Sequence, residues 1–168
     1  MANITLGGTP TTTCGTLPDN GTKASDFLLT GKDMNELSLK DFSGKKLILN
    51  IFPSVDTGVC SASVRAFNIR AAALSDTHVL CISRDLPFAQ TRFCGAEGLD
   101  HVVMLSDFKT GNFGQDHGLT ITGGAFDGLF ARCVIVLDSH HHVVYSELVS
   151  EIGHEPNYEA AIAAASAQ

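Results

Sequence analysis

Cysteine is the residue type in this sequence that could carry chemistry, because a thiolate is both a strong nucleophile and a redox-active group. The odd count of five, with no recognisable signal peptide, is not typical of a secreted protein built on disulfides. No Cys-x-x-Cys pair occurs, so neither a zinc ribbon nor the usual dithiol redox motif is present. Each of the five is then either a core residue or a reactive thiol: Cys14, Cys60, Cys81, Cys94 and Cys133.

Cys60 lies at the end of a strand–loop–helix pattern. The apolar run 46–52 is typical of a strand buried on both faces, and Pro53 ends it. A loop of small and polar residues follows, and a helical period begins near Cys60. The first turn of a helix has unpaired N–H groups and the positive end of the dipole, which favour a thiolate. The pattern predicts a reactive Cys60, and the alternative is a small residue of the apolar core.

The other elements must position this segment, and their order predicts the fold. The patterns predict further strands at 77–83, 102–105, 131–137 and 142–148, and helices at 61–76, 87–96 and 156–167. An N-terminal β-hairpin over 4–13, a strand at 27–29 and a helical turn at 37–42 are also expected, whereas 110–128 shows no clear period. A parallel β-α-β unit, an antiparallel hairpin and a final helix make an α/β, thioredoxin-like fold, with a central mixed sheet flanked by helices. The length fits a single domain, 1–168.

Charge and composition exclude several classes of partner. The formal net charge is −7, and the 11 lysines and arginines form no basic run, so we expect no nucleic-acid partner. No apolar run approaches the length of a membrane span, so we expect no membrane partner and a cytoplasmic location. No flavin, haem or nicotinamide motif is present, so catalysis is expected to use cysteine without a cofactor.

A histidine run at 140–142 raises the alternative of a metal-binding module. The run falls in a predicted turn between two strands, where consecutive side chains point in different directions. We therefore expect no metal site there, only adventitious binding.

Two blocks of sequence carry a resemblance to a known family. Pro53-x-x-x-Thr57-x-x-Cys60 is the active-site motif of peroxiredoxins, and the surrounding segment 50–68 resembles the bacterial thiol peroxidase subfamily, which uses two cysteines of one chain. The second block, 80–98, is similar to the same subfamily, as is Glu155-Pro-x-Tyr158 near the end. The likeness runs over nearly the whole chain.

The resemblance implies a role for each residue of the motif. Cys60 would attack the peroxide and become a sulfenic acid. Thr57 would hydrogen-bond thiolate and peroxide, and Pro53 would shield the sulfur from water. The family's arginine falls on Arg132, which would hold the thiolate and stabilise charge as the O–O bond breaks. Without the resemblance, Arg132 would be interpreted as a surface charge at a strand edge, and Arg65 and Arg92 as helix-surface residues.

The resemblance also implies a second cysteine and partners. Cys94, which on its own would be interpreted as a buried helix residue, would resolve the sulfenic acid through an intramolecular Cys60–Cys94 disulfide. Thioredoxin would then reduce that disulfide. The substrates would be hydrogen peroxide and alkyl or lipid hydroperoxides, and the enzyme would be a homodimer. Cys81 and Cys133 are expected to be core residues, and Cys14 has no role in the family.

Two alternatives use the same cysteine chemistry. A thiol-disulfide oxidoreductase on the same fold would need the Cys-x-x-Cys that is absent here. A thiol-based peroxide sensor, which would relay oxidation to a partner protein, remains open as an alternative or added role.

Overall fold

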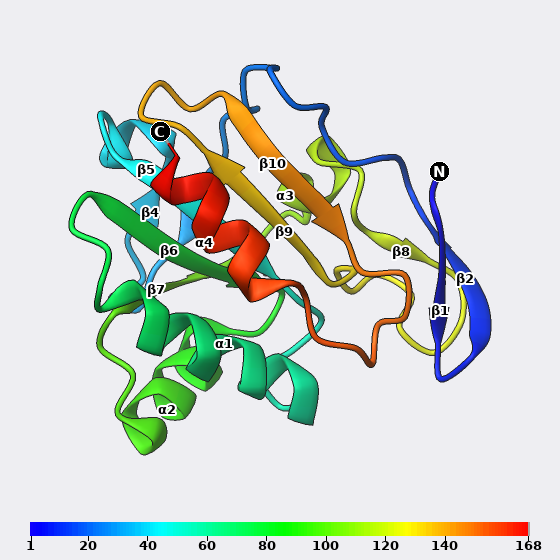
Figure 1. The fold of residues 1–168 in the computed structure, drawn as a ribbon. Coiled ribbons are helices and arrows are strands. Elements are labelled where there is room, and N and C mark those ends of the chain that lie inside the picture. Colours follow the sequence, from blue (N-terminus) through cyan, green and yellow to red (C-terminus); the bar gives the residue numbers. More distant parts are fainter. Residues whose placement is uncertain (168) are drawn as a thin grey trace.

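A seven-stranded mixed sheet forms the centre of the protein in its computed structural model, which describes residues 1–167 (Figure 1). The strands are β3 Leu29–Thr30, β4 Glu36–Leu37, β5 Lys46–Ile51, β6 Thr77–Ser83, β7 Val102–Ser106, β9 Cys133–Leu137 and β10 Val143–Leu148. They lie in the order β10-β9-β5-β6-β7-β3-β4, in which β5, β6 and β7 are parallel and the other pairs are antiparallel. The predicted thioredoxin-like α/β plan is confirmed.

Helices cover both faces of this sheet. The helical segments are the 3₁₀ turn η1 Leu39–Phe42, α1 Gly58–Ala71, α2 Pro87–Glu97, α3 Asn112–Asp116 and α4 Tyr158–Ser166. α1, α2 and α4 contribute to one apolar cluster, whereas η1 and α3 contribute to another cluster on the opposite face. The sheet is therefore the middle layer of three (Figure 1).

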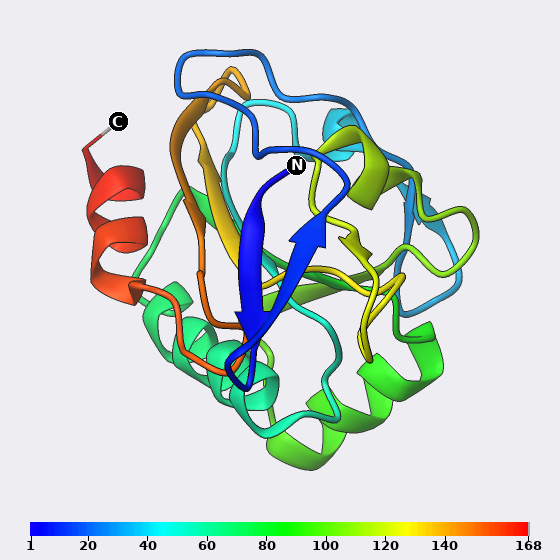
Figure 2. The same ribbon diagram turned by 90° about the vertical axis from the view of Figure 1, so that its right-hand side faces the viewer.

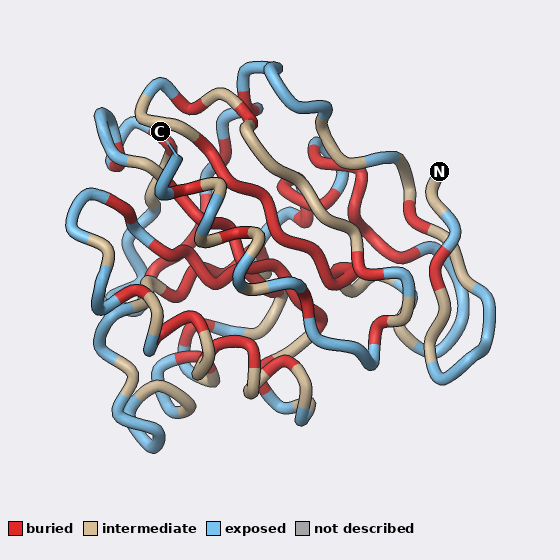
Figure 3. The backbone as a smooth tube through the Cα atoms, viewed as in Figure 1, coloured by how far each residue is buried: buried red, intermediate tan, exposed pale blue. Residues whose placement is uncertain are grey.

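The central strands are apolar over most of their length because both faces are covered. In β5, Leu47, Leu49 and Ile51 enter the cluster with α3, whereas Ile48 and the following Phe52 enter the cluster with α1. Figure 3 shows the same burial as an unbroken red trace through the middle of the sheet, while the helices alternate between buried and exposed positions. The predicted strand at 46–52 is confirmed.

Several boundaries differ from those predicted. α1 begins at Gly58 rather than 61 and ends at Ala71 rather than 76, which still places Cys60 in its first turn. The segment 110–128 contains α3 and the two-residue strand β8 Ile121–Thr122, both too short to produce a detectable period. β9 begins at Cys133 rather than 131, so Arg132 precedes the strand instead of belonging to it.

The expected N-terminal hairpin is formed by β1 Asn3–Leu6 and β2 Thr9–Thr13, with β8 pairing beside β2 (Figure 2). Gly7 and Gly8 make the two-residue turn with φ of 57° and 80°, a left-handed conformation that favours glycine. The hairpin is attached to the rest of the protein through the loop that follows β10, where Thr5 exchanges backbone hydrogen bonds with Ser150 and Ile152.

Glu151 fastens the turn of this hairpin. Its carboxylate accepts hydrogen bonds from the Thr5 hydroxyl at 2.6 Å and from the amides of Gly7 and Gly8 at 2.9 and 3.0 Å. The Thr5 hydroxyl first, and then the amides of Gly153, Gly8 and Gly7, lower the pKa of Glu151 to about 2.

Acid should therefore release the hairpin. Because the pKa of Glu151 is lower in the folded protein than in an unfolded chain, its contribution is complete above about pH 4.5 and is lost as the pH falls towards 2. We expect the Gly7 and Gly8 amide signals in NMR spectra to shift together between pH 4 and 2. In Glu151→Gln this transition should be missing, and an unchanged transition in that variant would assign it to another carboxylate.

Candidate active site

Cys60 is the third residue of α1, and Thr57 is the N-cap of that helix. The Cys60 side chain is 0% exposed and lies in one apolar cluster with Phe52, Val64 and Phe67. Unlike an ordinary core cysteine, it lies where the backbone N–H groups of a helix start are unpaired and the dipole is positive. Burial disfavours a negative charge on this sulfur, whereas the helix start favours one, so a cationic partner would add to what the helix start supplies.

Arg132 is the residue that the structure brings to Cys60. Its Nη2 donates a hydrogen bond to the Cys60 Sγ at 3.2 Å, and its Nε donates to the Ile152 carbonyl at 2.8 Å. The side chain is 1% exposed, so the alternative of a surface charge at a strand edge is wrong. Within the described chain, Nη1 has no hydrogen-bond partner. The guanidinium is thus fixed at one nitrogen, holds the sulfur with the second and has the third available for another acceptor.

Pro53 and Thr57 lie at the two ends of the loop between β5 and α1. Pro53 is buried and Thr57 is half-buried. The Thr57 hydroxyl donates to the Ser54 carbonyl at 3.2 Å rather than to sulfur, which leaves its oxygen lone pairs free to accept from a bound molecule. Both residues belong to the segment that ends at Cys60, but the structure records no hydrogen bond from the Thr57 side chain to that cysteine.

The carboxylate of Asp85, which follows β6, holds the loop between β5 and α1. It accepts from the Ser54 hydroxyl at 2.7 Å, the Val55 amide at 2.9 Å and the Ser83 hydroxyl at 2.6 Å. Sequence reasoning missed Asp85 because a single aspartate between a strand and a proline carries no signal of its own. Its one detectable mark is its place inside the second block of resemblance, 80–98.

Cys94 lies in α2, on the same side of the sheet as Cys60, and packs against the same apolar cluster. It is half-buried and lines a cavity of about 550 Å³ whose wall also includes Leu37, Leu99 and Met104. Burial first, and then the charge of Asp100, raises the pKa of Cys94. In the folded helix this cysteine is therefore kept as a neutral thiol.

The remaining cysteines differ from Cys60 in that no cation donates a hydrogen bond to the sulfur, although the charge of Arg132 does act on Cys133, where burial outweighs it. Cys81 and Cys133 are 0% exposed inside β6 and β9, as predicted for core residues. Burial raises the pKa of Cys81 to about 12 and also raises that of Cys133. Cys14 is half-buried, and its thiol donates to the Gly114 carbonyl at 3.6 Å. None of the five cysteines, all of which are described, is in a disulfide.

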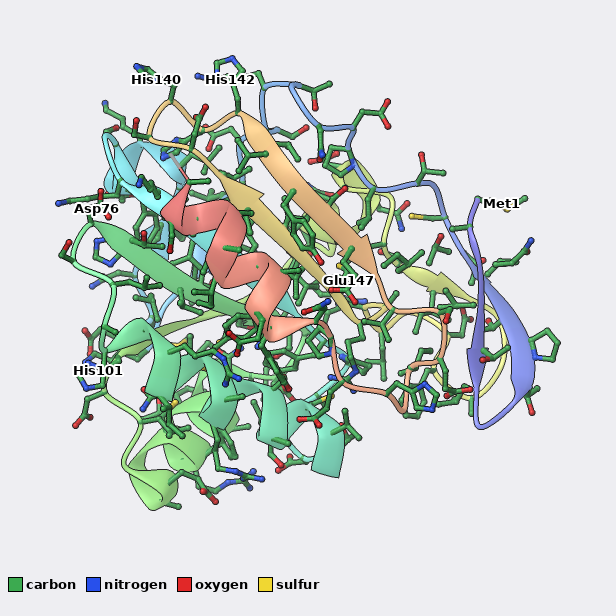
Figure 4. All side chains as sticks on the ribbon, viewed as in Figure 1. Met1, Asp76, His101, His140, His142 and Glu147 are labelled. Atoms are coloured by element: carbon green, nitrogen blue, oxygen red, sulfur yellow. The ribbon has the colours of Figure 1, made fainter. Side chains whose placement is uncertain are left out.

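The histidine run does not bring its rings together. Figure 4 shows His140 and His142 directed outward at the edge of the molecule. His141 is buried, with its Nε2 3.1 Å from the Phe42 carbonyl oxygen. Among residues 1–167, no group of three or more histidine, cysteine or acidic side chains is arranged to hold a metal ion. None of the helices in the same range is long and apolar enough to cross a membrane.

Comparisons with known proteins agree on one family. The family described as Redoxin matches residues 19–162. The chain is 52% identical to "Thiol peroxidase" from Corynebacterium glutamicum, over 98% of this chain and 99% of that protein. It is 54% identical to "Thiol peroxidase" from Mycobacterium bovis, over 98% of each.

Solved structures show the same fold. A peroxiredoxin-like protein from Aquifex aeolicus superposes with a TM-score of 0.94 at 32% identity, over 99% of this chain and 97% of that one. A thiol peroxidase from Chromobacterium violaceum superposes with a TM-score of 0.88 over 94% of this chain and 91% of that one, and its identity of 21% supports likeness of fold.

Proposed function

The chain belongs to the redoxin family as a thiol-dependent peroxidase, and from this premise we propose that Cys60 is the cysteine that reduces the peroxide. The observation that carries the proposal is the buried Arg132, whose Nη2 lies 3.2 Å from the Cys60 Sγ at the start of α1. A buried cation and a helix N-terminus on one sulfur are the two features that distinguish Cys60 from the other four cysteines.

In the first half-reaction, the Cys60 thiolate attacks the terminal oxygen of the hydroperoxide. A sulfur–oxygen bond forms as the O–O bond breaks, so the sulfur is oxidised to a sulfenic acid and the peroxide is reduced. The leaving oxygen takes up a proton and departs as an alcohol, or as water from hydrogen peroxide. The unpaired Nη1 of Arg132 supplies donors for the negative charge that develops on that oxygen.

Thr57 and Pro53 complete the site in this proposal. The Thr57 hydroxyl already donates to the Ser54 carbonyl, so it can accept the O–H of the peroxide and orient the oxygen to be attacked. Pro53 is buried and has no N–H to hydrate, which helps keep water from the thiolate. Thr57 therefore acts on the position of the peroxide, and Pro53 acts on the access of water to the sulfur.

The second half-reaction assigns Cys94 as the attacking thiol. Its sulfur attacks the Cys60 sulfenic sulfur, the S–S bond forms and water leaves. Both helix starts, at Thr57 and Leu86, lack a side-chain cap in the described chain, and Cys94 lies in the last turn of α2, which ends at a left-handed Gly98. We propose that these ends unwind, which would bring the sulfurs within bonding distance and relieve the burial that raises the pKa of Cys94.

The assignment of the two cysteines can be tested by mapping products. Fully reduced protein would be treated with one equivalent of an organic hydroperoxide, its remaining thiols alkylated, and its peptides identified by mass spectrometry. A rapid Cys60–Cys94 disulfide, with Cys14, Cys81 and Cys133 still alkylated after unfolding, is the expected result. An unmodified Cys60 would contradict the central assignment.

Cys94→Ser should separate the two half-reactions. We expect Cys60 to be oxidised at nearly the wild-type rate, because Arg132 and the helix start are untouched. When no external thiol is added, the sulfenic acid should then persist, and under excess peroxide it should advance to sulfinic acid. Cys14→Ser, which changes another half-buried cysteine, is the matched control. A disulfide between Cys60 and another cysteine of the chain in oxidised Cys94→Ser would assign resolution to that cysteine.

We also propose the partners that the family resemblance implies. Thioredoxin would reduce the disulfide in the cytoplasm, hydrogen peroxide and alkyl or lipid hydroperoxides would be the substrates, and the chain would act as a single domain.

A homodimer is supported by two exposed apolar side chains at the start of α2, Leu86 at 50% and Phe88 at 66%. Light scattering of the wild type and of Phe88→Ser would test that surface, and a thioredoxin-coupled assay would test the reductant.

A further inference from the structure

Asp85 is held firmly by the ends of two central strands. Its amide donates to the Ser83 hydroxyl at 3.3 Å, and its carbonyl accepts from the Ser106 hydroxyl. Ser83 and Ser106 end β6 and β7 and are 0% and 1% exposed. The Gln90 amide, one turn into α2, also donates to Ser83 at 3.1 Å. The backbone of Asp85 therefore has little freedom to move relative to the sheet.

From this fixed base the carboxylate organises the loop before Cys60. One oxygen accepts from the Ser54 hydroxyl, and the other accepts from the Val55 amide and from Ser83. The Ser54 hydroxyl in turn accepts from the Asp56 amide at 3.1 Å. Three consecutive loop residues are thus ordered around one side chain from a different part of the chain.

The orientation of Thr57 depends on the same contacts. Its hydroxyl and its amide both donate to the Ser54 carbonyl, at 3.2 and 3.3 Å. Ser54 is the residue that Asp85 holds by its hydroxyl. A movement of Ser54 would therefore turn the Thr57 hydroxyl, whereas Arg132, just before β9, contacts the sulfur independently of this loop and would stay in place.

We propose that Asp85 is a positioning residue for the peroxidase reaction, one that fixes the loop so that Thr57 presents its hydroxyl to the peroxide. This inference rests on the proposed function of Cys60. It predicts that losing the carboxylate impairs the reaction with peroxide and spares the intrinsic reactivity of the sulfur, because Arg132 and the helix start are unchanged.

Asp85→Asn is the appropriate change because it keeps the shape of the side chain. The amide has one acceptor oxygen and one donor NH₂, so it cannot accept from both sets of donors around it. Either the Val55 amide faces the NH₂ and loses its acceptor, or the Ser54 hydroxyl must turn to accept from the NH₂, and in both cases the charge-assisted bonds to the loop are lost. A loop displaced by about 1 Å can slow a reaction on the order of 100-fold.

A second contact between α2 and the loop offers a matched control. Arg92 Nη2 lies 2.7 Å from Asp56 Oδ1, but both side chains are more than 60% exposed, at 63% and 62%. Ion pairs between side chains this exposed contribute little to stability. Arg92→Ala should therefore change the rate with peroxide by less than about threefold, although it breaks a contact between the same two segments.

The experiment compares two reactions of Cys60 in each variant: oxidation by cumene hydroperoxide, followed by stopped flow, and alkylation by iodoacetamide, followed by mass spectrometry. For Asp85→Asn we expect oxidation to be slower by about 10- to 100-fold and alkylation to be unchanged or faster. Ser54→Ala should slow oxidation in the same direction, and the double variant should be no slower than Asp85→Asn alone. Circular dichroism would confirm that each variant is folded at the temperature used.

Other results would overturn the inference. Equal oxidation rates in wild type and Asp85→Asn would show that the loop is held without the carboxylate. A parallel loss of oxidation and alkylation would place the effect on the sulfur instead of on Thr57. If Asp85→Asn does not fold, Ser54→Ala decides by the same two rates. Failure of wild-type Cys60 to be oxidised would overturn the proposed function together with this inference, whereas fast wild-type oxidation isolates the role of Asp85.

Discussion

Cys60→Ser should abolish peroxidase activity, with a loss of more than about 10⁴-fold, or roughly 5.5 kcal/mol in activation free energy. The substitution replaces one atom and leaves the buried position, the helix start and Arg132 in place. A serine hydroxyl at neutral pH is almost wholly protonated, whereas sulfur is intrinsically nucleophilic and a few per cent ionised even in a free thiol. The measurement is consumption of an organic hydroperoxide in a dithiol-coupled assay.

The control for this variant is Cys81→Ala. Cys81 is also 0% exposed and belongs to the same apolar cluster, but burial raises its pKa to about 12, and its sulfur contacts the Asn50 amide rather than a cation. We expect Cys81→Ala to lower the free energy of unfolding by about 1 kcal/mol and to keep its peroxidase activity. Comparable losses of peroxidase activity in the two variants would mean that activity depends on the packing of the core and not on the chemistry of Cys60.

The elements that form locally could be predicted from the sequence. The strand at 46–52, the loop and the start of α1 follow from a continuous apolar run, a proline and a helical period, which are all properties of adjacent residues. The N-terminal hairpin is predictable for the same reason, since Gly7 and Gly8 mark its turn. Cys60 could therefore be singled out by its place in the chain before any partner was known.

The partners of Cys60 could not be predicted in this way, because they come from distant segments. Arg132 is 72 residues away from Cys60 in the chain, and its burial depends on a carbonyl, that of Ile152, in a loop after β10. Asp85 reaches Ser54 across 31 residues. Only the family resemblance pointed to Arg132, and neither pattern nor resemblance assigned a role to Asp85.

Removing the buried guanidinium of Arg132 should also have a large effect on the rate of Cys60 oxidation. Arg132→Met keeps a long side chain but removes the donor at 3.2 Å from the Cys60 Sγ and the unpaired Nη1. Losing one charge-assisted hydrogen bond should destabilise the Cys60 thiolate by about 1.5–3 kcal/mol. Losing a donor to the departing oxygen should slow the reaction by a further factor of about 10²–10³. We expect the rate of Cys60 oxidation to fall by at least about 10³-fold.

The same two reactions that test Asp85 distinguish Arg132 from it. Because Arg132 acts on the sulfur itself, Arg132→Met should slow alkylation by iodoacetamide as well as oxidation, and oxidation by the larger factor. Arg132→Lys, which keeps the charge but not the planar fork, should recover alkylation more fully than oxidation. Arg65→Met is the control, since Arg65 lies on α1 with its side chain 42% exposed and pairs with Glu97 at 3.5 Å. An oxidation rate within tenfold of wild type in Arg132→Met would show that the helix start alone activates Cys60, and the buried guanidinium would then be a structural partner of the Ile152 carbonyl.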